Sequence, residues 1–70
     1  MAEEVKTGDI VHLKWAGSVA EGRVIEVISE RAEILSKDKL IARNGTAKNP
    51  AVIIEHKSGN HVIKLKSELI

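Results

Sequence analysis

The sequence predicts an all-β domain, a small barrel of short strands, and three observations carry this prediction. Val and Ile recur in short runs, as is typical of strands. Apolar and polar residues alternate within several of these runs, which is the period of two of a β-strand. Glycine, proline and asparagine separate the runs, as turns do in an all-β fold. With no internal repeat or linker, the chain is expected to form a single domain, 1–70, with a flexible end at 1–6.

The first predicted strand, 10–15, alternates along its length. Its apolar residues Val11, Leu13 and Trp15 fall on one face, and its polar residues fall on the other. This pattern predicts a half-buried strand, which the small residues of 16–18 end.

The second predicted strand, 22–28, is rich in β-branched residues and carries apolar side chains on both faces. Such a pattern suits a strand that bends sharply and passes from one part of a barrel to another. Gly22 is expected to form a bend or bulge at the start of this strand.

The segment 29–39 is ambiguous. Its residues favour two helical turns by propensity, with Ser29 as the N-terminal cap. An extended or mixed segment is the alternative, and we favour it because the rest of the chain consists of short predicted strands. A short strand at 39–43 and the turn dipeptide Asn44-Gly45 follow.

A closing hairpin is predicted from the apolar runs 51–56 and 61–66, and two registers are open. A two-residue loop at 58–59 would place His56 opposite His61. Both histidines would then share one face of the hairpin.

A three-residue loop at 57–59, with its glycine in the left-handed region, is the more usual use of this sequence, and we favour it. This register gives the following cross-strand pairs: Ile53 with Ile63, and Ile54 with Val62. The two histidines then point to opposite faces. After the hairpin, 67–69 is expected to form a single closing turn, with Leu69 tucked under the barrel.

Several short motifs along the chain resemble those of a known family. They are Gly8-Asp9-Ile10-Val11, Gly22-Arg23-Val24, Arg43-Asn44-Gly45, Asn49-Pro50-Ala51, Ile54-Glu55, Gly59, Val62-Ile63-Lys64 and Ser67-Glu68-Leu69. Together they are similar to the hypervirulence-associated protein Tudor-like family of short bacterial and fungal proteins, a domain of unknown function. The resemblance implies an SH3-like, Tudor-type barrel of about five antiparallel strands, with 29–39 as a long connection between strands. It implies no established activity.

Composition argues against several functional classes. The absence of cysteine removes disulfides and thiolate metal sites, and the three histidines lack a metal-ligand spacing, so no metal or cofactor is expected. No nucleophile is paired with a base and an orienting group, so the chain is not expected to be an enzyme. An acidic N-terminus and the lack of a long apolar run predict a cytoplasmic protein with no membrane partner.

The family name suggests a ligand that this sequence does not support. Tudor domains that bind methylated lysine or arginine hold the methylated group in a cage of aromatic rings. Trp15 is the single aromatic residue of this chain. One ring does not make a cage, so no methyl-lysine recognition is expected.

The candidate binding residues are one aromatic and five basic residues: Trp15, Lys14, Arg23, Arg43, Lys64 and Lys66. The indole of Trp15 would stack on a base or a proline if exposed, or plug one end of the core if buried. Lys64 and Lys66 share one strand face by the period of two. With Lys14 or Arg43 nearby they would line a phosphate track, whereas the alternative role of such lysines is to protect an exposed strand edge.

Two functions of different classes remain. The first is a small, non-catalytic interaction module that binds protein, which fits the net charge of +1. An exposed apolar patch around Trp15 or 29–39 would support it. The second is a nucleic-acid-binding barrel with lysine and arginine contacts to phosphate, because 6–11 followed by 22–27 resembles the pattern of ribosome-associated KOW barrels. The sequence does not indicate an oligomeric state.

Overall fold

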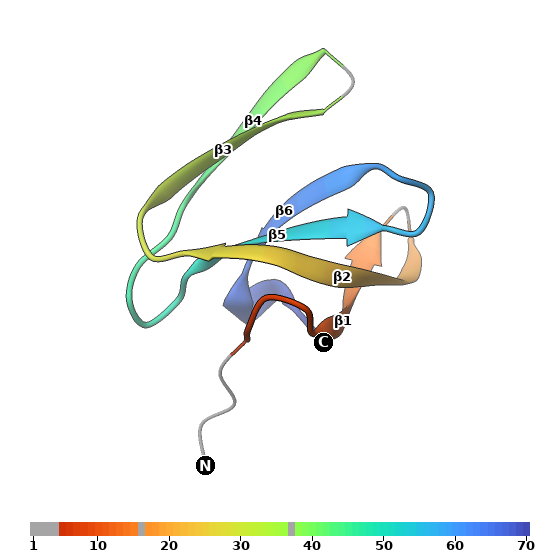
Figure 1. Cartoon of the computed structure of the whole chain (residues 1–70), viewed down its shortest axis with the longest axis horizontal. Helices are drawn as coiled ribbons and strands as arrows, with labels where there is room; N and C mark the ends of the chain where they lie inside the picture. The colour runs from red at the N-terminus through yellow and green to blue at the C-terminus, as the bar shows by residue number, and fades with distance from the viewer. Residues whose placement is uncertain (1–4, 16, 37) are drawn as a thin grey trace.

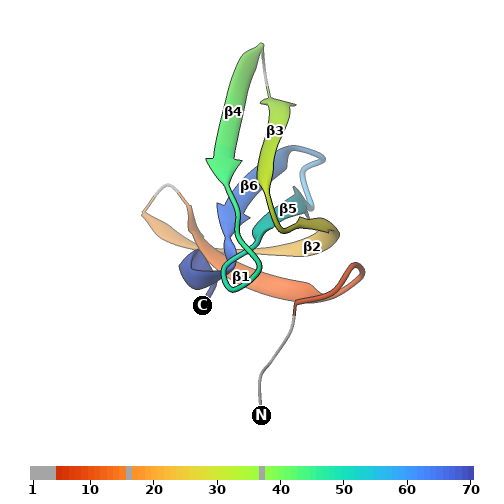
Figure 2. The ribbon, with the colours of Figure 1, turned by 90° about the vertical axis from the view of Figure 1, so that its left-hand side faces the viewer.

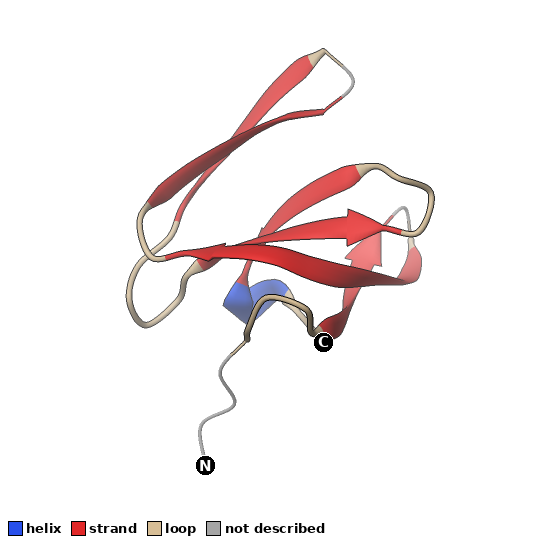
Figure 3. Cartoon of the chain, viewed as in Figure 1, coloured by secondary structure: helices blue, strands red, loops and turns tan. Residues whose placement is uncertain are grey.

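The computed structural model describes residues 5–15, 17–36 and 38–70, and in this part of the chain it contains six antiparallel strands and one 3-10 turn (Figure 1). The strands are β1 (Ile10–Trp15), β2 (Ser18–Ile28), β3 (Arg31–Ser36), β4 (Lys39–Asn44), β5 (Ala51–His56) and β6 (His61–Leu65), and the turn is η1 (Lys66–Glu68). The all-β prediction is therefore confirmed (Figure 3). The expected flexible end lies partly outside the described residues, since 1–4 are not described.

The strands form two separate sheets. β1, β2, β5 and β6 follow one another in a four-stranded sheet, and β3 and β4 pair only with each other. Figure 2 shows this β3–β4 hairpin standing out from the larger sheet. The extended form predicted for 29–39 is confirmed for Arg31–Ser36, and residue 37 lies outside the described residues. The segment is not the long connection that the resemblance implied, because it contains β3, which adds a sixth strand to the expected five.

β2 contains one irregularity in its pairing with β5, and it does not lie at the start of the strand, where it was expected. The strand begins at Ser18, and its register with β5 shifts between Val24 and Glu26. Gly22 lies within the strand instead, where a Cβ atom would collide with the side chain of Ile54. A glycine is needed here because the backbone of β2 approaches β5 closely.

The β5–β6 hairpin has the register that we favoured, with Ile53 opposite Ile63. The loop holds Gly59 at a φ of 95°, in the left-handed region. The backbone N–H of His56 donates to the carbonyl of Asn60 at 2.8 Å, which closes a three-residue loop. The turn residue has thus set the pairing of the whole hairpin.

β5 has apolar side chains on both faces because both faces are covered. Toward the barrel interior, four fully buried residues form a first core: Leu13, Val24, Val52 and Ile54. On the opposite face, a second core joins the large sheet to β3 of the hairpin: Ala32, Ala51, Ile53 and Ile63. A strand enclosed in this way has a continuous apolar run rather than an alternating one.

The end of the chain returns to the first strand. Leu69 forms an isolated bridge with Leu13, and the backbone N–H of Ile70 donates to the carbonyl of His12 at 2.8 Å. Leu69 also packs against the first core, as expected. The return is a single bridge and not a strand ladder, so the strands of the described residues do not close into a continuous barrel. Within the described ranges, no helix is long and apolar enough to cross a membrane.

Candidate interaction surface

The base of the β3–β4 hairpin is joined to η1 by an ion pair. The guanidinium of Arg43 lies 2.5 Å from one carboxylate oxygen of Glu68, and the other oxygen accepts the backbone N–H of Leu65 at 2.8 Å. This N–H bond is the main cause of a lowered pKa at Glu68. Desolvation opposes it, and the charges of Arg43 and Lys64 lower the pKa further.

A second set of contacts joins the loop before β5 to the same turn. The side-chain amide of Asn49 donates to the hydroxyl of Ser67 at 3.1 Å, and its oxygen accepts the Ser67 backbone N–H at 2.9 Å. Gly45 lies where a Cβ atom would be 2.6 Å from the carbonyl oxygen of Ile28. These residues, which carried much of the family resemblance, therefore act as a structural latch between the hairpin and the end of the chain.

The structure places the residues of the predicted phosphate track in different elements. Arg43 is paired with Glu68, and Lys64 lies close enough to influence the same carboxylate. β6 ends at Leu65, so Lys66 lies in η1 and does not share a strand face with Lys64. Lys66 instead lines a separate surface depression beside Lys48.

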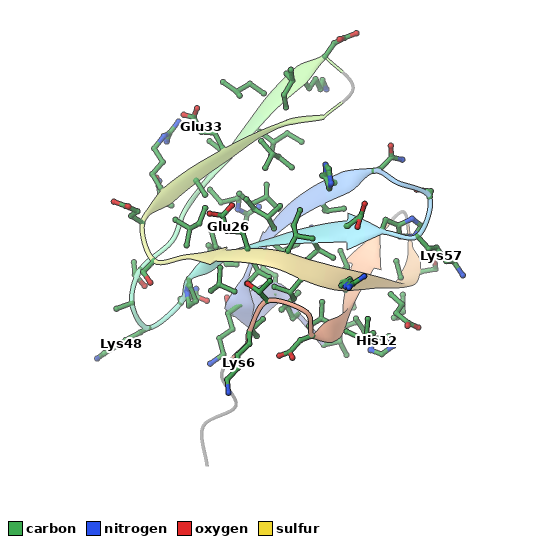
Figure 4. The ribbon with its side chains drawn as sticks, viewed as in Figure 1. Lys6, His12, Glu26, Glu33, Lys48 and Lys57 are labelled. Atoms are coloured by element: carbon green, nitrogen blue, oxygen red, sulfur yellow. The ribbon has the colours of Figure 1, made fainter. Side chains whose placement is uncertain are left out.

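Lys14 and Arg23 are exposed on the outer face of β1 and β2. Lys14 is paired across the strands with Val19, and Arg23 lies between Ile10 and Glu55. The side chain of Trp15 lies outside the described part of the structure. Figure 4 shows that further lysines are also dispersed, with Lys48 and Lys57 at opposite ends of the molecule.

The histidines make local contacts. His12 lies 3.8 Å from Glu21 across the β1–β2 pair, and both side chains are at least half exposed. His56 Nδ1 lies 2.8 Å from the hydroxyl of Ser58 and also accepts the Ser58 backbone N–H, which is a contact within the turn. Among the described residues, no group of three potential metal ligands is found.

The outward face of the β3–β4 hairpin carries the largest exposed apolar side chains. Leu35 and Leu40 lie opposite each other, 70% and 67% exposed. Ile41, on the other face of the hairpin, is 37% exposed. The sequence pointed to 29–39 as one place for such a patch. It missed Leu40, whose position opposite Leu35 follows only from the pairing of β3 with β4.

The comparison with protein families gives a match over nearly the whole chain. The model of the hypervirulence associated proteins TUDOR domain matches residues 8–69. No curated protein and no solved structure matches the chain. A Tudor domain implies an SH3-like fold, which agrees with the all-β architecture of the described residues. The chain belongs to the family of hypervirulence associated proteins with a Tudor domain.

Proposed function

We propose that the chain is a non-catalytic module that binds protein through the outward face of its β3–β4 hairpin. The observation that carries this proposal is the exposed pair of Leu35 and Leu40. Two facing leucines on a projecting hairpin form a small contiguous apolar surface that is open to a partner.

The energetics of this pair favour contact with a partner. Complete burial of a leucine contributes about 1.5–3 kcal/mol. Because Leu35 and Leu40 are 70% and 67% exposed, most of this contribution is not used within the folded chain. A partner that covers both side chains would gain about 2–4 kcal/mol before the costs of association.

Nucleic-acid binding has less support. A phosphate track requires several free cations along one line, because each neutralised phosphate adds to affinity by releasing counterions. Arg43 is engaged with Glu68, and Arg23 lies beside Glu55. Two of the five basic candidates therefore have an acidic neighbour within the described residues, which weakens support for a phosphate track.

The test is photo-crosslinking in a native extract, with a photoreactive residue at position 40 and a matched control at position 19. Val19 is also an exposed apolar residue, at 59%, but it lies on β2. A protein captured at position 40 alone is then purified. It should bind the wild-type chain at least tenfold more tightly than it binds the Leu35→Ser/Leu40→Ser variant.

A parallel titration checks the alternative function. Amide chemical shifts of the labelled chain are followed with short single-stranded RNA and with duplex DNA, at low and at physiological salt. We expect no localised shifts. Shifts at Lys14, Arg43 and Lys64 that fade as salt rises would overturn the proposal in favour of phosphate binding.

A further inference from the structure

We propose that the protein that binds this face is a second copy of the chain, packed hairpin on hairpin about a two-fold axis that runs along the hairpin. This inference rests on the proposed function, because it names the partner of the same surface. It is carried by the register of β3 with β4 and by the charges on the outward face.

The register divides the hairpin into two faces. The inward face carries Ala32, buried in the second core, and Arg43, held by Glu68. The outward face carries three cross-strand pairs, from the base of the hairpin toward its tip: Arg31 with Asn44, Glu33 with Ala42, and Leu35 with Leu40. The body of the molecule lies against the inward face, so the outward face is open to a partner along its length (Figure 2).

The outward face is complementary to itself when the two hairpins point the same way. A two-fold axis along the hairpin lays β3 of one copy over β4 of the other. Leu35 then faces Leu40 of the second copy, and by symmetry Leu40 faces Leu35 of the second copy. Four leucines therefore meet near the tips of the two hairpins. Glu33 faces Ala42 of the second copy. No two charges of the same sign oppose each other.

The base of the hairpin is complementary as well. The two-fold axis places Arg31 over Asn44 of the second copy. Within one chain the Arg31 guanidinium already lies 3.4 Å from the Asn44 side-chain oxygen and 3.2 Å from Glu33. Its remaining N–H groups are able to donate across the interface.

The antiparallel alternative is unfavourable. When two hairpins that point in opposite directions overlap fully, β3 lies over β3 of the second copy and β4 lies over β4 of the second copy. Glu33 would then face Glu33 of the second copy, and Leu35 would face Arg31. Like charges would be brought together and the leucines would be left against a cation, so the parallel arrangement is preferred.

The size of the face sets the strength of the dimer. Each leucine offers on the order of 100 Å² of apolar surface, so the whole contact is smaller than the roughly 1,200 Å² of a stable, specific interface. The inferred dimer is therefore weak and reversible. The association should be visible only as the concentration of the chain rises into the high micromolar range.

Sedimentation of the full chain over a range of concentrations, from low micromolar to about millimolar, tests the association. The average mass should rise from 7.6 kDa toward twice that value. The Leu35→Ser/Leu40→Ser variant should associate at least tenfold more weakly, and Val19→Ser should associate like the wild type. Because all three side chains are exposed, the unfolding midpoints should stay close to that of the wild type.

Cross-linking tests the axis. The chain has no cysteine, so Leu35→Cys and Leu40→Cys each provide one defined thiol. With a short bismaleimide, Leu35→Cys alone should yield dimer, because the parallel arrangement brings position 35 of both copies to the same end of the contact, whereas the antiparallel arrangement places them at opposite ends. A mixture of Leu35→Cys and Leu40→Cys should yield at least as much dimer, since position 35 faces position 40 of the second copy. A dimer yield from Leu35→Cys no greater than that from Val19→Cys would overturn the parallel arrangement.

The outcomes separate this inference from the proposed function. A monomer at every concentration, or an association that Leu35→Ser/Leu40→Ser leaves unchanged, overturns the second copy as partner. If position 40 nevertheless captures a different protein that loses affinity for this variant, the proposed function stands. If neither association is found, both proposals fail.

Discussion

Substitutions of Glu68 measure separately the contributions of two contacts that hold the β3–β4 hairpin to the end of the chain. One carboxylate oxygen of Glu68 pairs with Arg43, and the other accepts the backbone N–H of Leu65. Glu68→Gln keeps an oxygen for the N–H and removes the charge, whereas Glu68→Ala removes both contacts. Arg43→Gln removes the ion pair alone.

The two contacts differ in their expected contributions. The Arg43 and Glu68 side chains are 32% and 35% exposed, so solvent screens the ion pair, and its contribution is about 0.5–1 kcal/mol. The hydrogen bond from a backbone N–H to an ionised carboxylate contributes about 1.5 kcal/mol more. We expect Glu68→Ala to lower the free energy of unfolding by about 2 kcal/mol, and Arg43→Gln by about 0.5–1 kcal/mol.

Urea unfolding of the wild type, Arg43→Gln, Glu68→Gln and the double variant measures the coupling between the two side chains. A coupling energy of about 0.5–1 kcal/mol is expected at pH 7. Because the pKa of Glu68 is lowered in the folded state, its contribution is complete above the ordinary value of 4.5 and is lost as the pH falls through the lowered pKa. The stability difference between the wild type and Glu68→Gln should therefore shrink in acid.

Two results would refute this account of the latch. If Arg43→Gln and Glu68→Gln were additive, the ion pair would contribute nothing to the joining of hairpin and turn. If the difference between the wild type and Glu68→Gln stayed constant from neutral pH to about pH 3, the carboxylate of Glu68 would not be stabilised in its ionised form by the fold.

Three further predictions concern the scaffold, and urea midpoints at constant m-value check each of them. Gly22→Ala should destabilise the fold by about 1–3 kcal/mol, because the new Cβ collides with the buried side chain of Ile54. Gly59→Ala should lower the free energy of unfolding by about 1 kcal/mol, because alanine is strained at a φ of 95°, and no atom lies near the added Cβ. Gly59→Asn should lower it less, because asparagine tolerates the left-handed region better than alanine does. Asn49→Ala should lower the free energy of unfolding by about 1–2 kcal/mol, because it removes both hydrogen bonds to Ser67. Ser67→Ala removes only the bond to the hydroxyl and should lower it less. Equal losses in the two variants would contradict the hydrogen bonds assigned to Asn49.

The parts of the fold that follow from local chemistry could be predicted from the sequence. Gly59 favours the left-handed region, and this preference alone selected the register of the β5–β6 hairpin. The alternation of β1 likewise placed Leu13 in the core and Lys14 on the outside. In both cases the information lies within a few residues of the feature that it determines.

The remaining parts depend on pairings that a single sequence does not contain. The residues of β3 favour a helix by propensity, but pairing with β4 and the burial of Ala32 in the second core override this preference. The sequence predicts Arg43 as a candidate phosphate ligand, because nothing in it indicates that Glu68 lies beside this side chain. For the same reason the sequence could not show that Leu35 and Leu40 form one patch.

The division between latch and hairpin explains why family membership defines the fold of this chain but not its ligand. The motifs that carried the resemblance build the first core, the β5–β6 turn and the contacts of Arg43 and Asn49 with the closing turn. None of them lies within 25–42, the stretch that holds most of the projecting hairpin. A scaffold fixed at its base by the latch can present different side chains at positions 35 and 40 without loss of the barrel, because these side chains contribute little to either core. On the function proposed above, substitutions at positions 35 and 40 should change the affinity for a partner while leaving the unfolding midpoint nearly unchanged.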